Sequence, residues 1–147
     1  MIVDDEPYNV LGMQLILSKM KIKGLSNVID RAYNGLEALT KVKEGIEKGT
    51  HTYGLILTDI SMPVMDGFEF TEEVRNYYRE SKVPQPMIVA CTGHVEEEYI
   101  KKAWTHEIDE IVPKPVKPEI LQEIFQVLIW TIHTLINSNV ICINSSL

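Results

Sequence analysis

The chain has 147 residues, of which 45% are hydrophobic and 24% are charged, and its formal net charge is -7. This length and composition fit one globular domain with a sizeable core and exclude a disordered chain. The acidic balance argues against direct nucleic-acid binding, because phosphate backbones are bound by clustered Lys and Arg side chains.

Cysteine usage and the length of the apolar segments indicate in which compartment the protein works. Two cysteines make neither a disulfide framework nor a zinc site, so a reducing compartment is expected. The first residues show no secretory signal pattern. The apolar stretch 127–136 is shorter than the roughly 20 residues of a membrane span, and we interpret it as part of a helix. A cytoplasmic protein without a membrane partner is therefore predicted.

Five short apolar runs predict five strands, each bounded by polar residues or by turn-forming Gly, Pro and Asn. The first run, Ile2-Val3, is shorter than the five or six residues of a usual strand. It is therefore interpreted as the end of a strand whose beginning is missing. The predicted strands cover residues 2–3, 28–33, 55–59, 87–91 and 108–113.

Apolar residues at helical spacing follow each predicted strand. Pro7 suits the first turn of a helix, and Gly24 suits its end. The charge run from Glu96 to Lys102 has acids first and bases last, which complements a helix dipole and indicates a solvated face. The predicted helices cover residues 7–20, 36–46, 67–77, 95–104 and 118–136.

Strands that alternate with helices indicate a parallel sheet covered on both faces. We therefore predict an α/β fold, a doubly wound five-stranded parallel sheet of the flavodoxin-like (βα)5 type. The domain is expected to span residues 1–136. Residues 137–147 are rich in Asn and Ser without periodicity, and a tail is predicted there.

Polar side chains stand where the predicted strands end. Asp4 and Asp5 follow the first strand, Asp59 ends the third, and Thr92 and Lys114 follow the fourth and fifth. In a parallel sheet of this kind the carboxyl ends of neighbouring strands meet at one edge, where ligands bind. Each residue taken singly is more often a turn or capping residue, but together they predict an acidic pocket with one hydroxyl and one cation.

The predicted pocket suits Mg²⁺ and phosphate chemistry. Three carboxylates repel one another unless a cation joins them, and Mg²⁺ takes oxygen ligands from carboxylates, water and phosphate. A carboxylate can also attack a phosphoryl group and form an aspartyl phosphate. Lys114 and the metal would neutralise the transferred group, and the hydroxyl of Thr92 could bond one of its oxygens.

Four motifs stand in the same order and at the same strand ends as in a known family. Over roughly residues 1 to 130 the sequence resembles the receiver domains of two-component response regulators. Pro7 and Asn9, after the acid pair, also resemble the receivers that are fused to hybrid histidine kinases. The motifs are Val3–Pro7, Thr58–Gly67, Cys91–Gly93 and Lys114–Pro115.

The resemblance implies a phosphoacceptor and a metal site. Asp59 would accept the phosphoryl group and also bind Mg²⁺. Asp5 would be a direct Mg²⁺ ligand, Asp4 would act through water, and the backbone carbonyl of Ser61 would be a further ligand.

The resemblance also implies a switch. Lys114 would pair with the Asp59 carboxylate or its phosphate, and Thr92 would be the hydroxyl that moves toward the phosphate. The side chains of Ser61 and His94 would tune how long the phosphate survives. The protein would thus be a signalling receiver rather than an enzyme with a separate substrate, catalysing only its own phosphorylation and dephosphorylation.

Three positions depart from the family pattern. Ile111 stands three residues before the lysine, where the family commonly has an aromatic residue, so no ring is available there to swing between two positions. Glu107 stands where a glycine is expected, and Gly54 where an acid is usual. All three lie outside the acidic cluster, so we expect these departures to affect the conformational change that follows phosphorylation more than phosphorylation itself.

The expected partners are a histidine kinase or a histidine phosphotransfer protein. A second copy of the chain is also expected to bind, in a homodimer through the last two helices.

One alternative function is that of a Mg²⁺-dependent phosphatase of the haloacid dehalogenase type. Such enzymes have a second acid two residues after the nucleophile, and Ser61 stands at that position here. Another alternative is a receiver-like interaction module that is never phosphorylated. Apolar residues such as Phe125 and Trp130 in the last predicted helix favour it, because exposed apolar patches mark partner surfaces.

Overall fold

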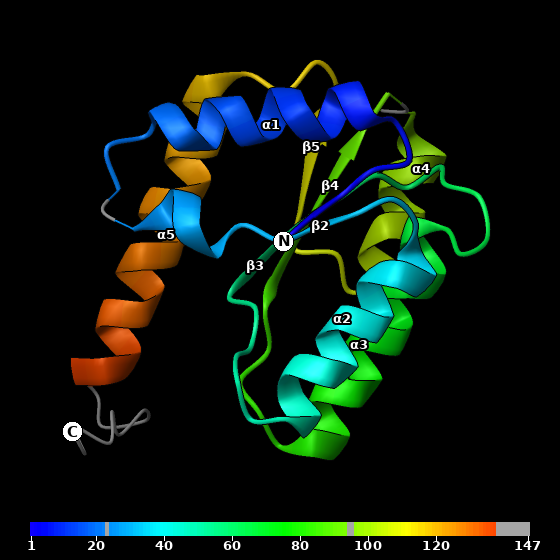
Figure 1. Cartoon of the computed structure of the whole chain (residues 1–147). Coiled ribbons are helices and arrows are strands. Elements are labelled where there is room, and N and C mark those ends of the chain that lie inside the picture. The colour runs from blue at the N-terminus through cyan, green and yellow to red at the C-terminus, as the bar shows by residue number, and fades with distance from the viewer. Residues whose placement is uncertain (23, 94–95, 138–147) are drawn as a thin grey trace.

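The computed structural model describes residues 1–22, 24–93 and 96–137, in which helices flank one sheet (Figure 1). Its described strands are β1 (Ile2–Val3), β2 (Arg31–Ala32), β3 (Leu55–Thr58), β4 (Met87–Thr92) and β5 (Glu110–Pro113). They pair in parallel in the order β2-β1-β3-β4-β5. The order reverses direction at β1, as in a doubly wound sheet, so the predicted fold class is confirmed.

Helices cover both faces of this sheet. The described helices are α1 (Pro7–Lys19), the 3-10 helix η1 (Leu25–Val28), α2 (Gly35–Glu47), α3 (Gly67–Ser81), α4 (Glu97–Thr105) and α5 (Pro118–Asn137). Helices α1 and α5 pack on one face, against Leu57 and Val89. Helices α2 and α3 pack on the other, against Ile56 and Ile88, and α4 adds Ala103 beside α3. The central strands β3 and β4 thus pack against helices on both faces, which explains their nearly continuous hydrophobic runs.

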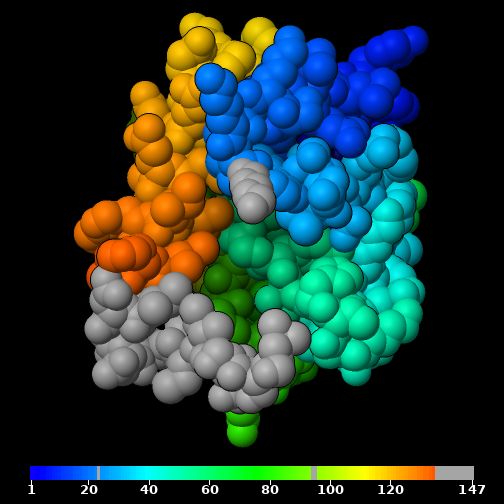
Figure 2. Space-filling view, turned by 60° about the vertical axis from the view of Figure 1, so that its left-hand side comes forward, coloured from blue at the N-terminus to red at the C-terminus, as the bar shows by residue number. Residues whose placement is uncertain are grey.

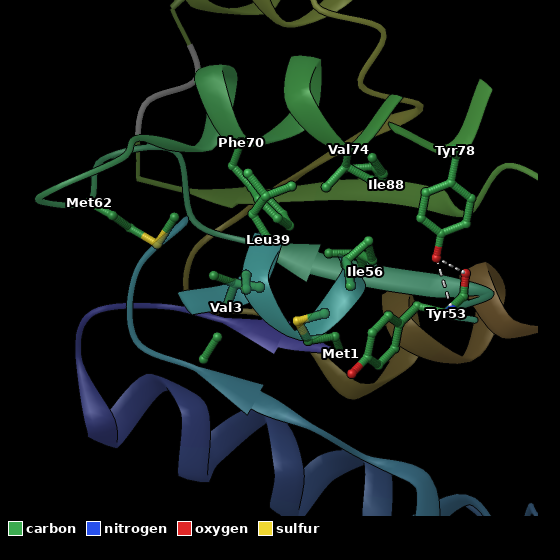
Figure 3. Packing of buried hydrophobic residues seen from close by; sticks show 13 residues of the cluster. Met1, Val3, Leu39, Tyr53, Ile56, Met62, Phe70, Val74, Tyr78 and Ile88 are labelled. Atoms are coloured by element: carbon green, nitrogen blue, oxygen red, sulfur yellow. Dashed lines mark hydrogen bonds between the residues drawn. The ribbon is translucent and has the colours of Figure 1, made fainter. Parts of the chain in front are cut away.

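Figure 3 shows the core on the α2 and α3 side, where Phe70 and Val74 lie over Ile56 and Ile88. Tyr78 closes this core at the amino end of β3. Its hydroxyl accepts a hydrogen bond from the backbone N–H of Tyr53 at 3.0 Å. A buried phenol needs such a partner, so this contact fixes the chain where it enters β3.

The predicted second strand over 28–33 and the predicted end of the first helix were partly wrong. Helix α1 ends at Lys19, and Gly24 begins η1 instead, with a φ of +81° that glycine adopts without strain. Residues Leu25 and Ile29 pack against the α1 and α5 face of the core. This packing holds residues 25–28 in a 3-10 turn, and only Arg31 and Ala32 remain to pair with β1.

Side-chain caps fix the start of two helices that follow strands. Asn34 accepts a hydrogen bond from the backbone N–H of Glu37, and Asp66 accepts from the N–H groups of Phe68 and Glu69. Such caps satisfy N–H groups that have no partner inside the helix. Helix α3 therefore begins at Gly67, directly beside the carboxyl end of β3.

Candidate functional site

The carboxyl ends of three strands bring three charged side chains into contact. Asp4 follows β1, Asp59 follows β3, and Lys114 follows β5. The Lys114 Nζ atom lies 2.7 Å from Asp4 Oδ2 and 2.7 Å from Asp59 Oδ2. One lysine thus bridges two carboxylates that are 55 residues apart in the chain.

Asp4 is completely buried, and its two oxygens differ in their surroundings. Oδ1 accepts hydrogen bonds from the backbone N–H of Glu6 and the side chain of Asn9, each at 3.0 Å. Oδ2 makes the ion pair with Lys114 but receives no hydrogen bond of good geometry from any described residue. A buried acceptor with one open lone-pair direction is suited to a cation or to ordered water.

Asp59 is held rigidly by the backbone around it. Oδ1 accepts hydrogen bonds from the N–H groups of Ile60 at 2.7 Å and Ser61 at 3.4 Å, and Oδ2 accepts from Lys114. A Cβ on Gly67 would lie 2.2 Å from the Asp59 carbonyl oxygen, so glycine is required where α3 starts. The approach of α3 therefore fixes the turn that orients the carboxylate.

The cluster carries more negative than positive charge. Oxygens of Asp4, Asp5 and Asp59 all lie within 4.8 Å of one another, in a group of acids that could hold a metal ion. Burial by itself would lower the pKa of Lys114, but the close contacts of its ammonium with the carboxylates of Asp4 and Asp59 outweigh burial and raise it. Since Lys114 stays protonated, three carboxylates face one cation and the ionised cluster has an excess of two negative charges.

This arrangement fits Mg²⁺ on chemical grounds. The ion prefers oxygen ligands and uses only one or two carboxylates, with water and phosphate filling the other positions. The cluster offers such oxygens, an excess negative charge and the incompletely satisfied Asp4 Oδ2. Asp5 is half-buried, so it faces both the cluster and the solvent from which an ion would arrive.

Thr92 and Ser61 lie at the same edge of the sheet, while His94 lies outside the described residues. Thr92 is the buried last residue of β4, and its backbone carbonyl accepts a hydrogen bond from the N–H of Lys114 at 2.9 Å. Ser61 is exposed at the rim beside Asp59. The switch role of Thr92 and the ligand role of the Ser61 carbonyl stay predictions.

The departures from the family pattern are accommodated without disrupting the sheet. Ile111 packs with Tyr99 against a cluster that contains Ile60 and Phe68, next to the Asp59 turn. Glu107 has a φ of +58°, the left-handed conformation that glycine adopts most easily. Gly54 is exposed, and a Cβ there would meet open space.

A second charged network, absent from the predictions, surrounds Arg75 on α3. Its guanidinium donates to the carbonyls of Pro86 and Glu107, at 2.7 and 2.8 Å, and to Asp109 Oδ2 at 2.6 Å. Asp109 Oδ2 also accepts from the N–H of Ile88 at 2.6 Å. The available sequence signal was an arginine directly after Val74 and three residues before Tyr78, on the apolar side of a helix.

The sequence and the fold can be placed among known proteins. The model of the response regulator receiver domain matches residues 1–126. The chain is 30% identical over 126 residues to the hybrid signal transduction histidine kinase L of Dictyostelium discoideum, which covers 86% of this chain and 7% of that protein. This relative is therefore far longer than the chain.

Two smaller proteins match over most of their length. The chemotaxis protein CheY of Halobacterium salinarum is 33% identical over 102 residues, which is 69% of this chain and 76% of CheY. The crystal structure of a two-component response regulator from Clostridium difficile superposes with a TM-score of 0.69 and 28% identity. It covers 87% of this chain and 92% of that one.

Among the described residues, no helix combines the length and the apolar character that crossing a membrane requires.

Proposed function

The chain belongs to the response regulator receiver domain family, and from this premise we propose that Asp59 accepts a phosphoryl group in a Mg²⁺-dependent reaction. The chain is a receiver domain of two-component signalling. One observation carries the assignment to Asp59: Lys114 ties its carboxylate to Asp4 inside a cluster with excess negative charge.

The proposed step is an in-line displacement at phosphorus. An oxygen of Asp59 attacks the phosphoryl group of a phosphohistidine or of acetyl phosphate, a new O–P bond forms, and the donor's N–P or O–P bond breaks. The electron pair of the broken bond leaves with the donor. Lys114 would turn from the carboxylate to the phosphate, and the hydroxyl of Thr92 would supply a further hydrogen bond.

The N–H groups of Ile60 and Ser61 give the reaction its geometry. They bind Asp59 Oδ1, so this oxygen is directed at the backbone while Oδ2 faces the Lys114 ammonium. Positioning accounts for much of the rate of phosphoryl transfer, because the protein contributes little covalent chemistry beyond the nucleophile. Asp4, Asp5, Asp59 and the carbonyl of Ser61 would hold Mg²⁺, which when bound neutralises charge on the transferred group.

The surface beside the pocket supports docking of a helical phosphodonor. Tyr8, Leu11 and Leu15 are exposed apolar residues on α1. A groove of about 150 Å³ next to them is lined by α1, Lys114 and Pro115. A histidine kinase or phosphotransfer protein that covered this groove would present its phosphohistidine close to Asp59, and such exposed apolar patches often serve binding.

The intact mass of the protein after incubation with acetyl phosphate and Mg²⁺ tests the acceptor. One phosphate adduct is expected on the wild type, and none on Asp59→Ala or in the presence of EDTA. Glu73→Ala is a matched control, because it removes an exposed acid on α3 that lies outside the cluster. Phosphorylation of Asp59→Ala to the wild-type level would refute the assignment.

A second experiment separates the acceptor from the docking surface. Leu11→Glu should accept phosphate from acetyl phosphate at the wild-type rate but from a phosphorylated phosphotransfer protein at least about tenfold more slowly, because a charge would enter an apolar contact. Equal slowing with both donors would show that the substitution disturbs the pocket itself. If no donor yields an adduct, the interaction-module alternative replaces the proposal.

A further inference from the structure

The side chain of Asn9 connects helix α1 to the buried carboxylate of Asp4. Its Nδ2 atom donates a hydrogen bond to Asp4 Oδ1 at 3.0 Å, and the backbone N–H of Glu6 donates to the same oxygen, also at 3.0 Å. An ionised carboxylate oxygen only accepts hydrogen bonds, and it has two lone pairs. Both lone pairs of Oδ1 are therefore used by donors from the segment that begins α1.

These two bonds fix the start of α1 on Asp4. The N-cap residue of the helix is Glu6, whose side chain makes no capping hydrogen bond. Asp4 accepts the Glu6 N–H in its place, and the backbone N–H of Asn9 donates to the Glu6 carbonyl at 3.0 Å. Asn9 is thus held in the first turn of the helix, at a fixed position relative to Asp4.

Binding of Oδ1 also determines the direction of Oδ2, because a carboxylate is planar and Asp4 is completely buried. Oδ2 lies 2.7 Å from the Lys114 Nζ atom but accepts no hydrogen bond of good geometry from any described residue. Asp4 belongs with Asp5 and Asp59 to the acids whose oxygens could hold a metal ion. The two donors thus occupy one oxygen of Asp4 and leave the other open to a cation.

We propose that Asn9 is a positioning residue of the Mg²⁺ site and orients the Asp4 carboxylate toward the ion. This role rests on the proposed function, because it takes the acidic cluster as the place where Mg²⁺ binds. Groups that hydrogen-bond a ligating carboxylate fix its orientation, and their loss typically weakens metal binding by about 10- to 100-fold. The Asn9 amide contacts the oxygen of Asp4 that has no open direction, so it acts through Asp4 and not as a ligand.

The surroundings of Asn9 make its removal a local change. Its side chain is half-buried and lines the groove of about 150 Å³ next to Lys114 and Pro115. Figure 2 shows α1, in blue, at the surface of the molecule beside the yellow segment that leads into α5. Truncation of Asn9 therefore enlarges an open groove, creates no cavity in the apolar core, and leaves Asp4 in contact with Glu6 and Lys114.

A role confined to the helix would have a different consequence from a role in positioning. If Asn9 only stabilised the start of α1, its loss would lower the free energy of unfolding and leave the affinity for Mg²⁺ unchanged. If Asn9 orients Asp4, its loss weakens Mg²⁺ binding in a protein that remains folded. The affinity for the ion therefore distinguishes the two roles, without any phosphoryl donor.

Isothermal titration calorimetry of the full chain with MgCl₂ tests the proposal. Asn9→Ala should raise the dissociation constant of Mg²⁺ at least about tenfold, while its circular dichroism spectrum stays that of the wild type. An unchanged dissociation constant would overturn the proposal and leave the proposed function standing. A wild type that binds no Mg²⁺ would overturn both. Asn76→Ala makes the same substitution on α3, where the side chain contacts Arg79, and should bind Mg²⁺ as the wild type does.

A second pair of variants isolates the hydrogen bond. Gln and Met have similar side-chain length and helix propensity, but only Gln can donate to Asp4 Oδ1. Asn9→Gln should therefore bind Mg²⁺ more tightly than Asn9→Met, and equal affinities would contradict the proposal. The loss in Asn9→Ala should also be larger for Mg²⁺ than for Ca²⁺, because Mg²⁺ demands nearly ideal octahedral geometry and Ca²⁺ tolerates a flexible one. Equal losses for the two ions would show that the orientation of Asp4 is not what Asn9 provides.

Discussion

Lys114 and Arg75 are both cations held inside this domain, and their surroundings differ. The Arg75 side chain is 7% exposed and meets one carboxylate together with backbone carbonyls. The Lys114 side chain is 22% exposed and faces a cluster of three carboxylates. The Arg75 network balances one positive with one negative charge, whereas the Lys114 cluster has an excess of two negative charges.

The difference separates a structural network from a site built for a ligand. Arg75 joins α3 to the segments before β4 and β5, and the oxygens that accept its hydrogen bonds are all within 3.3 Å. The Lys114 cluster leaves Asp4 Oδ2 without a hydrogen bond of good geometry among the described residues. Buried polar groups are stable when satisfied, and the unbalanced cluster is the place where we propose that a cation and a phosphoryl group bind.

The largest expected effect comes from breaking the balanced network. Arg75→Ala should lower the free energy of unfolding by about 3 kcal/mol, because the carbonyls of Pro86 and Glu107 and the Asp109 carboxylate lose a charged donor. Urea denaturation measures the change. Arg79→Ala, one turn further along α3, removes only exposed contacts, an ion pair to Glu107 and a hydrogen bond to Asn76, and should change stability by less than about 1 kcal/mol. Equal losses would contradict a structural role specific to Arg75.

Removing a charge from the Lys114 cluster should increase stability, whereas removing the Arg75 charge lowers it. In EDTA, Asp5→Asn should raise the free energy of unfolding by about 1 kcal/mol, because one of three mutually repelling carboxylates is neutralised. Mg²⁺ at about 100 times its dissociation constant should stabilise the wild type by about 2.7 kcal/mol and the variant much less. Thermal unfolding with and without Mg²⁺ checks both. Glu73→Gln, which neutralises an exposed acid on α3, should change neither the stability in EDTA nor the stabilisation by Mg²⁺. If Asp5→Asn were less stable than the wild type in EDTA, the carboxylates of the cluster would not repel one another as expected.

Alkaline pH distinguishes the two cations. The pKa of Lys114 is raised above its ordinary value of 10.5, so its stabilising contribution is fully present below pH 10.5 and is lost as the pH rises through the raised value. Arginine stays protonated throughout this range. Between about pH 10 and about pH 12, where Lys114 loses its proton, the free energy of unfolding should therefore fall less in Lys114→Arg than in the wild type. Identical pH profiles would show that Lys114 gains no stability from its carboxylate partners.

The smallest effect is expected at the edge of the Arg75 network. Glu107→Gly should relieve the left-handed backbone by about 0.5 to 1 kcal/mol and lose an exposed ion pair worth about as much, so stability should change by less than about 1 kcal/mol. The Glu107 carbonyl that binds Arg75 remains in the variant. Glu107→Ala keeps the backbone strain without the ion pair and should be less stable than Glu107→Gly. If urea denaturation showed Glu107→Ala to be more stable than Glu107→Gly, the left-handed backbone at residue 107 would not be strained.

Sequence patterns predicted the sheet well where strands are buried on both faces. Runs such as 55–57 and 87–91 are apolar throughout, and such runs are typical of strands between two layers of helices. The second strand was predicted too long, because residues 25–28 satisfy their backbone groups in a 3-10 turn while Leu25 packs into the core. Alternative local hydrogen bonding of this kind leaves no clear periodicity.

Sequence patterns likewise predicted one group of charged residues and missed another. The sequence placed Asp4, Asp5, Asp59 and Lys114 at one edge of the sheet because each follows an apolar run, and parallel strands bring such positions together. The Arg75 network had no comparable signal. Its acceptors come from two loops and a left-handed turn, and a carbonyl group belongs to every residue type.

The sequence by itself determined the order of strands and helices, the positions of the acids at strand ends and the family, because these depend on local patterns along the chain. The tertiary structure alone decided which charges meet, that Lys114 is shared by Asp4 and Asp59 while Arg75 is fully satisfied, and that the end of α5 extends beyond the core it helps to cover. Such features depend on distances between segments far apart in the chain, and residue spacing carries no direct record of those distances.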